Sequence, residues 1–167
     1  MAYKALPTQE RLKELFDYNP ETGIFTRLTD VGRRYKAGSI AGTINKNGYT
    51  DISVDKKRYK AHRLAWIYYH GTDPKELFID HINGDTINNS ITNLRLSTNQ
   101  QNVFNKKCVG NIPYKGVSYS KGRNRYVAQI KINGKTKCLG YFHTPEEAHK
   151  VYRDAAKRLH GEFFYTG

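Results

Sequence analysis

A short stretch near the middle of the chain groups side chains that could bind a metal ion and activate water. Asp80 and His81 directly follow two apolar residues, and a run rich in Asn and Gly continues to Asn89. A carboxylate and an amide oxygen can hold a hard cation such as Mg²⁺. A neutral imidazole beside that cation can take a proton from water. Hydrolysis of a phosphodiester needs a metal and a base, so this segment points to a nuclease.

The elements around this pair are predicted to be a strand, a loop, a second strand and a helix. Residues 94–96 form the second strand, and either Ser97 or Thr98 can cap a helix that runs to about residue 107. This order would bring Asp80 and His81, on the first strand, near Asn102 on the helix.

The preceding part of the chain is predicted to supply a small α+β scaffold. Apolar residues at helical spacing predict helices over residues 9–18 and 61–70, the second ending at Gly71. A short strand is expected over residues 24–27, and a hairpin over residues 49–60.

The composition favours a polyanionic partner. The 167 residues include 28 Lys and Arg against 15 Asp and Glu, a formal net charge of +13, with 13 Tyr interleaved among the basic residues. Such an excess suits nucleic acid or an anionic membrane surface. No apolar run approaches the ~18 residues that span a bilayer, and the N-terminus lacks the apolar core of a signal peptide. We therefore expect nucleic acid and no membrane.

The cysteine content argues against a structural zinc site. Cys108 and Cys138 are the two cysteines, and the sequence has no Cys-x-x-Cys pair. Two thiols without a secretory signal predict reduced cysteines and a cytoplasmic location.

The last third of the chain is predicted to be a separate basic module. Residues 108–167 hold 11 Lys and Arg against 4 Asp and Glu. Alternating residues predict strands over 116–119, 125–130 and 137–141, and Asn-Gly at 133–134 is a strong hairpin signal. Thr144 and Pro145 mark the start of a helix that ends near residue 160.

The first module resembles the HNH endonucleases, most closely the phage and intron-encoded homing endonucleases of the His-Asn-Asn variety. The residues that carry this resemblance are Asp80, His81, Asn93 and Asn102, in the setting of the segment 61–66. The resemblance implies that His81 is the general base and that Asn93 pins the loop and orients His81. It also implies that Asp80 and Asn102 bind one divalent metal.

The third position of the motif is Asn102, where many relatives have His. This departure favours an oxygen ligand, and hence Mg²⁺ or Mn²⁺. Asn105, three residues on, is the alternative ligand. Arg63 or Arg95 is expected to assist at the phosphate, and His62 is either a DNA contact or a buried hydrogen-bonding partner. We interpret Asn88 and Asn89 as turn formers.

The second module resembles the Apetala/ethylene-response-factor DNA-binding domain over residues 112–164. The segments that carry this resemblance are 114–117, 125–130, 139–142 and 144–156. It implies a three-stranded antiparallel sheet that is packed on one helix and lies in the major groove of DNA. The expected DNA contacts are Lys115, Ser118, Tyr119, Lys121, Arg123, Arg125, Gln129, Lys131, Lys135 and Lys137.

The sequence thus predicts an α+β protein of two modules. Residues 1–107 would form an HNH nuclease module of the ββα-metal fold, residues 108–113 a linker, and residues 114–167 the DNA-binding module. The expected function is site-specific cleavage of double-stranded DNA in a bacterial or phage-infected cell. A monomer with one active site favours nicking, whereas a dimer could cut both strands. A non-catalytic DNA-binding regulator and an RNA-binding protein are the alternatives.

Overall fold

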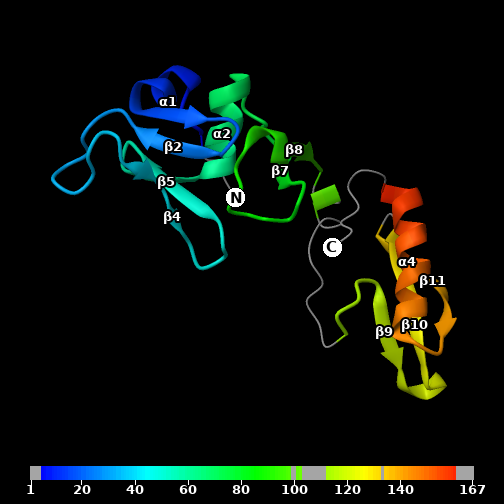
Figure 1. Cartoon of the computed structure of the whole chain (residues 1–167). Helices are drawn as coiled ribbons and strands as arrows, with labels where there is room; N and C mark the ends of the chain where they lie inside the picture. The colour runs from blue at the N-terminus through cyan, green and yellow to red at the C-terminus, as the bar shows by residue number, and fades with distance from the viewer. Residues whose placement is uncertain (1–4, 99–100, 103–111, 133, 161–167) are drawn as a thin grey trace. The chain divides into compact units, whose positions relative to one another are not determined.

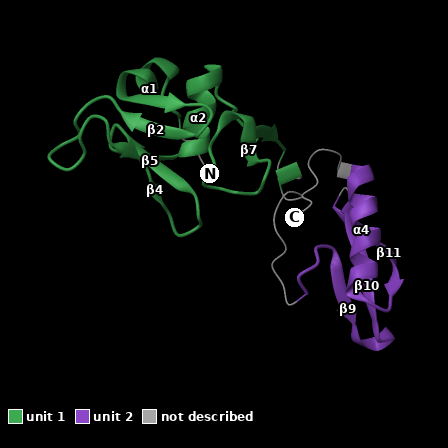
Figure 2. Ribbon diagram, viewed as in Figure 1, with its two compact units in different colours: residues 1–102 green, residues 103–167 purple. Residues whose placement is uncertain are grey.

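The computed structural model describes residues 5–98, 101–102, 112–132 and 134–160. The chain divides into two compact units, Met1–Asn102 and Val103–Gly167 (Figure 2). The α+β class predicted from the sequence is confirmed, since each unit combines helices with small antiparallel sheets (Figure 1). The predicted module boundary at residue 107, and residues 108–111 of the predicted linker, lie outside the described residues.

Unit 1 contains most of the secondary structure. In chain order its elements are α1 (Gln9–Leu15), β1 (Phe16–Asn19), β2 (Ile24–Arg27), β3 (Ile40–Ala41), β4 (Thr43–Ile44), β5 (Thr50–Val54), β6 (Lys57–Lys60), α2 (Ala61–His70), β7 (Phe78–His81), the 3₁₀ turn η1 (Ile91–Asn93) and β8 (Leu94–Ser97). The strands form the sheets β1-β2-β3, β4-β5-β6 and β7-β8.

One apolar core joins these small sheets to α2. Leu64 and Ala65 of α2 are fully buried, together with Leu12 of α1, Phe25 of β2 and Ile52 of β5. Burial of such apolar side chains is the main source of stability for sheets that are too small to be stable alone. The helix α2 spans the predicted residues and ends at Gly71 as expected.

The first helix is shorter than predicted. The spacing of Leu12, Leu15 and Phe16 predicts a helix to residue 18, but α1 ends at Leu15. Phe16 and Tyr18 instead alternate as buried residues of β1, which pairs with β2. Their rings pack against Phe25, with the Tyr18 and Phe25 centroids 4.6 Å apart. Packing across the sheet therefore overrides the helical pattern.

Unit 2 is a three-stranded antiparallel sheet with one helix packed on it. Its elements are β9 (Val117–Ser120), the 3₁₀ turn η2 (Lys121–Arg123), β10 (Arg125–Ile132), β11 (Lys135–Phe142) and α4 (Pro145–His160). The strand order is β11-β10-β9. Ala128 and Ile130 of β10 form a core with Ala148, Tyr152 and Ala156 of α4.

Two local features fix the position of α4 in unit 2. Thr144 Oγ1 accepts the backbone N–H of Glu147 at 3.2 Å, and the Glu147 carboxylate accepts the backbone N–H of Thr144 at 3.3 Å. This is a reciprocal cap at the helix start. Gly116 has a φ of +76°, and a Cβ there would lie 2.0 Å from the Tyr152 ring. The residue just before β9 can approach α4 this closely because it is glycine.

Within the described part of the chain, no helix is long and apolar enough to cross a membrane.

Candidate active site and basic sheet face

Asp80 and His81 are the last two residues of β7, and both are buried, with exposed fractions of 5% and 4%. The strand β7 pairs with β8 in a register that places Asp80 opposite Arg95 and His81 opposite Leu94. A single hairpin therefore carries the carboxylate, the imidazole and a guanidinium.

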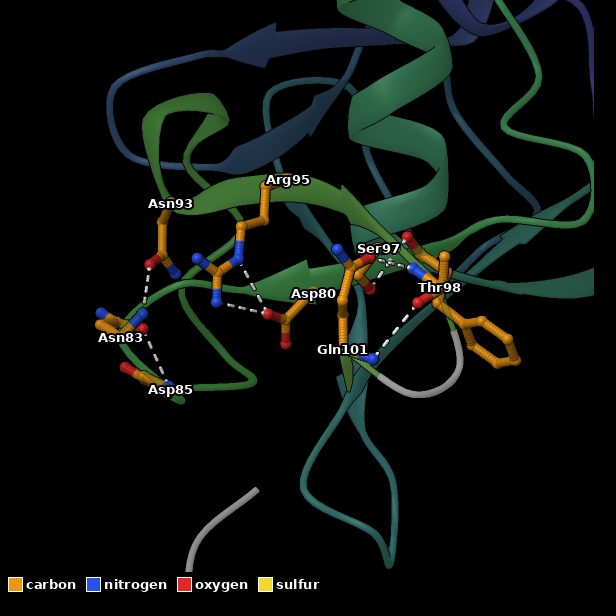
Figure 3. A network of polar contacts seen from close by, with 9 residues as sticks. Asp80, Asn83, Asp85, Asn93, Arg95, Ser97, Thr98 and Gln101 are labelled. Carbon is orange, nitrogen blue, oxygen red and sulfur yellow. Dashed lines mark hydrogen bonds and ion pairs between the residues drawn. The ribbon is translucent and has the colours of Figure 1, made fainter. Parts of the chain in front are cut away.

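Arg95 neutralises Asp80 across the two strands. Its Nε and Nη2 donate to Asp80 Oδ2 at 3.0 and 2.9 Å (Figure 3). The Arg95 side chain is only 13% exposed. A buried carboxylate is costly unless it is paired with a cation or a metal, and Arg95 provides that pairing.

The loop between the two strands is held by Asn93. Its Oδ1 accepts the backbone N–H of Asn83 at 3.0 Å (Figure 3), and its Nδ2 donates to the Asn88 carbonyl at 2.8 Å. The backbone N–H of Ile82 donates to the Asn93 carbonyl at 2.8 Å. Asn93 thus connects both ends of the segment that follows His81.

Asn102 follows a helix start that the sequence placed at Ser97 or Thr98. Thr98 is the residue that forms the cap: its Oγ1 accepts the backbone N–H of Gln101 at 3.3 Å, and Gln101 Oε1 accepts the backbone N–H of Thr98 at 2.8 Å (Figure 3). The backbone N–H of Asn102 donates to the Thr98 carbonyl at 3.0 Å. Asn105, the alternative ligand, lies outside the described residues.

The two residues that the sequence predicts as metal ligands are oxygen donors, which suit a hard divalent cation better than zinc. Asp80 offers carboxylate oxygens and Asn102 an amide oxygen, which are the ligand types that Mg²⁺ takes, with water completing its shell. Among the described residues, no group of three or more His, Cys, Asp and Glu side chains could hold a metal ion.

The rings of His62 and Tyr49 pack against the ring of His81. The His62 ring, from α2, lies edge-on to it with centroids 5.1 Å apart, and the Tyr49 ring lies 5.5 Å from His62 and 6.0 Å from His81. Burial lowers the pKa of His81, an effect that the Asn89 hydrogen bond and the nearby carboxylates of Asp80 and Asp85 partly offset. His81 is therefore neutral at neutral pH, as a general base must be.

His62 is half-buried in α2, with its ring packed edge-on against the ring of His81. Burial, followed by the charges of His81, Arg63 and Lys60, lowers the pKa of His62 from 6.5 to about 3. His62 is therefore uncharged over the whole physiological range.

This shift predicts acid sensitivity of unit 1. Between pH 6.5 and about 3 the unfolded state holds a proton on His62 that the folded state lacks, so stability falls as the pH is lowered. By pH 4.5 the loss should reach roughly 2–3 kcal/mol. Urea unfolding followed by the fluorescence of Trp66, the single Trp of the chain, should show a weaker dependence on pH in a His62→Gln variant. An unchanged dependence would contradict the shift.

Asn89 is a site residue that the sequence reasoning missed. It is 3% exposed, and its Oδ1 lies 3.2 Å from His81 Nε2. Asn88, by contrast, acts as the predicted turn former, since its Oδ1 accepts from the backbone N–H and the hydroxyl of Ser90. Adjacent Asn residues in a turn carry no sequence signal that would separate these roles. Arg63 forms an ion pair with Asp73 at 3.5 Å, and its charge contributes to the lowered pKa of His62.

The expected DNA contacts on the strands of unit 2 lie on two different faces of the sheet. Side chains alternate along a strand and cross-strand partners share a face. Residues paired with the core residues of β10 therefore lie on the helix side, and the others lie on what we call the outer face. The expected contacts on the outer face are Ser118, Arg125, Gln129 and Lys131, and those on the helix side are Tyr119, Lys135 and Lys137.

Three further expected contacts lie outside the strands. Arg123 and Lys121 are exposed in η2, and the Arg123 guanidinium lies 4.6 Å above the ring of Tyr141. Tyr141 pairs with Val127, so this stacked pair belongs to the outer face. Lys115 is half-buried before β9, and its carbonyl lies 3.2 Å from His149 Nδ1.

Known proteins are similar to this chain in the region that carries the candidate site. A family model described as HNH endonuclease matches residues 59–104, which include both strands of the β7–β8 hairpin. Protein 3.8 of Escherichia phage T7 is 33% identical over 113 residues, covering 65% of this chain and 93% of the relative. The chain belongs to the HNH endonuclease family.

Two further matches carry the same family name. An uncharacterized HNH endonuclease of Acanthamoeba polyphaga mimivirus is 36% identical over 121 residues, 72% of this chain, and the chain spans 63% of that relative's length. A solved structure of the HNH homing endonuclease I-HmuI, concerned with DNA binding and cleavage by that protein, aligns with 87% of this chain and 77% of its own, with a TM-score of 0.43 and 23% identity.

Proposed function

We propose that this protein is a site-specific DNA endonuclease of the homing type, in which unit 1 cuts and unit 2 binds double-stranded DNA. The observation that carries the proposal is the buried Asp80–His81 pair at the end of β7, beside Arg95 and closed by Asn93. This pair joins a metal-ligand carboxylate to a neutral base, which is the chemistry that hydrolysis of a phosphodiester needs.

Each residue of the site has a defined task in the proposed reaction. His81 takes a proton from the water that attacks phosphorus in line with the leaving 3′ oxygen. Asp80 and Asn102 would hold Mg²⁺, with Mn²⁺ as a substitute, and the bound cation supplies charge stabilisation at the scissile phosphate. Arg95 adds positive charge next to Asp80, and Asn93 keeps the loop that follows His81 in place. The products are a 5′-phosphate and a 3′-hydroxyl.

Unit 2 is proposed to supply affinity and register, as an Apetala/ethylene-response-factor-like domain. A three-stranded antiparallel sheet backed by one helix supports this assignment. The outer face presents Arg125, Gln129 and Lys131, with Arg123 stacked on Tyr141. Basic and amide side chains on a sheet that fits the major groove can contact both phosphates and base edges.

Lysines on the two faces of the sheet are expected to differ in their effect on DNA binding. Lys131→Ala, on the outer face, should weaken DNA binding and reduce the salt dependence of log K by about 0.9 for the phosphate contact that is lost. Lys137→Ala removes another exposed lysine, from the helix side, and should leave both quantities close to wild type. Gel-shift titrations at several salt concentrations measure both. Equal losses for the two variants would contradict binding through the outer face.

The proposed activity is tested by mapping cleavage on an end-labelled duplex with Mg²⁺. Cuts at defined positions with 5′-phosphate and 3′-hydroxyl ends are expected, on one strand for a monomer with a single site. Binding without cleavage would instead indicate a non-catalytic regulator. A preference for structured RNA over duplex DNA in a gel-shift titration would exclude DNA as the ligand. The viral and phage relatives support placing the protein in the cytoplasm of an infected or bacterial host cell.

A further inference from the structure

The side-chain amide of Asn89 has one possible orientation. Its Nδ2 donates to the backbone carbonyl of Ile87 at 2.9 Å, and its Oδ1 lies 3.2 Å from Nε2 of His81. A carbonyl oxygen can only accept a hydrogen bond. The nitrogen end of the amide must therefore face Ile87, which leaves the oxygen end facing the imidazole.

That orientation determines which ring nitrogen of His81 carries the proton. An amide oxygen also only accepts, so Nε2 must be the donor. A neutral imidazole has one N–H and one lone pair. With the proton on Nε2, the lone pair is on Nδ1.

The segment that contains Asn89 is held by the β1–β2 hairpin. The Tyr18 hydroxyl donates to the Asn89 carbonyl at 2.8 Å, and the backbone N–H of Ile91 donates to the Pro20 carbonyl at 2.9 Å. Gly23 has a φ of +73°, and a Cβ on it would lie 2.3 Å from the carbonyl carbon of Asn89. This hairpin precedes the region matched by the family model, residues 59–104.

We propose that Asn89 is a positioning residue that holds His81 in its Nε2-protonated tautomer, so that Nδ1 accepts the proton of the attacking water, and that the β1–β2 hairpin keeps Asn89 in place. The part that concerns water rests on the proposed nuclease function, whereas the tautomer itself does not.

The proposed step transfers one proton from water to His81. One O–H bond of water breaks and its proton passes to Nδ1, while the oxygen forms the bond to phosphorus and the bond from phosphorus to the 3′ oxygen breaks. The 3′ oxyanion that leaves takes a proton from solvent water and becomes the 3′-hydroxyl. The ring becomes an imidazolium whose Nε2–H still donates to Asn89 Oδ1. Because a charged donor forms the stronger hydrogen bond, Asn89 also stabilises the protonated ring.

The tautomer can be read directly by long-range ¹H–¹⁵N correlation spectroscopy of the full-length protein without metal. The His81 resonances are assigned by their loss in His81→Ala. We expect the pattern of an Nε2-protonated neutral ring in the wild type and in Asn88→Ala, the matched control. Asn89→Leu should show a mixture that includes Nδ1-protonated rings. An Nδ1-protonated ring in the wild type would overturn the proposal.

Cleavage kinetics provide a second readout. Asn89→Leu should lower kcat about 10- to 100-fold with KM and DNA affinity unchanged. If Asn89→Leu fails to fold, Gly23→Ala acts through the hairpin and should shift the His81 pattern in the same direction. A wild-type rate in Asn89→Leu overturns the positioning role. Failure of every form to cut DNA would refute the proposed function, while the spectra would still decide the tautomer.

Discussion

Replacing His81 by Ala is expected to slow strand cleavage by about 10²- to 10⁴-fold, the usual contribution of a positioned general base. DNA affinity should stay close to wild type, because His81 is 4% exposed and contributes little binding surface. Single-turnover cleavage with excess protein measures the chemical step, and a gel shift in the absence of metal measures binding.

The control for this variant is an exposed histidine of unit 2. His143→Ala removes a side chain of the same type outside the site and should cut at the wild-type rate. Trp66 fluorescence reports whether unit 1 remains folded in His81→Ala. Cleavage by folded His81→Ala at the wild-type rate would show that His81 is not the base.

The second large effect concerns stability. Arg95→Met should lower the free energy of unfolding of unit 1 by about 3–5 kcal/mol at neutral pH, because it leaves the buried Asp80 carboxylate without its cationic partner. The two guanidinium contacts to Asp80 Oδ2, at 2.9 and 3.0 Å, are the interactions that are lost. Urea unfolding followed by Trp66 fluorescence measures the change.

A surface ion pair in the same unit provides the comparison. Arg11 contacts Asp55 at 2.7 Å, but both side chains are about half exposed, so Arg11→Met should cost no more than about 1 kcal/mol. Asp80→Asn combined with Arg95→Met should recover much of the loss, because no unpaired charge is then buried. Equal costs for the two Arg variants, or strict additivity in the double variant, would argue against a buried pair.

The local parts of the fold could be predicted from the sequence. The helix over residues 61–70 and the strand over residues 24–27 have the predicted bounds, because helical spacing with a terminal glycine and a short β-rich run are local signals. The C-terminal end of α1 was predicted wrongly. Phe16 and Tyr18 satisfy a helical pattern, but their pairing with β2 depends on residues that the pattern does not include.

The site divides in the same way. The sequence predicts that Asp80, His81 and Asn93 lie close together, and the structure places them in and next to one short hairpin. The contact of Asn89 with His81 could not be predicted, because Asn89 is held by Tyr18, a residue 71 positions earlier.

The sequence also did not predict which residues lie on each face of the unit 2 sheet. A register shift at Ala128/Gln129 places Gln129 opposite Cys138 and Ile130 opposite Lys137. Without that bulge, the alternation would turn Lys135 and Lys137 to the outer face. A shift of one residue exchanges the two faces of a strand. No residue type in this part of the sequence indicates the position of the bulge.

The most direct test of the central claim is the nicking of supercoiled plasmid DNA that carries a target site. Wild-type protein and a parallel preparation of His81→Ala are each incubated with Mg²⁺ and with EDTA. We predict conversion to nicked circles by the wild type with Mg²⁺, and no conversion in the other three reactions. Nicking by both proteins, or nicking that persists in EDTA, would contradict a metal-dependent nuclease site at Asp80 and His81.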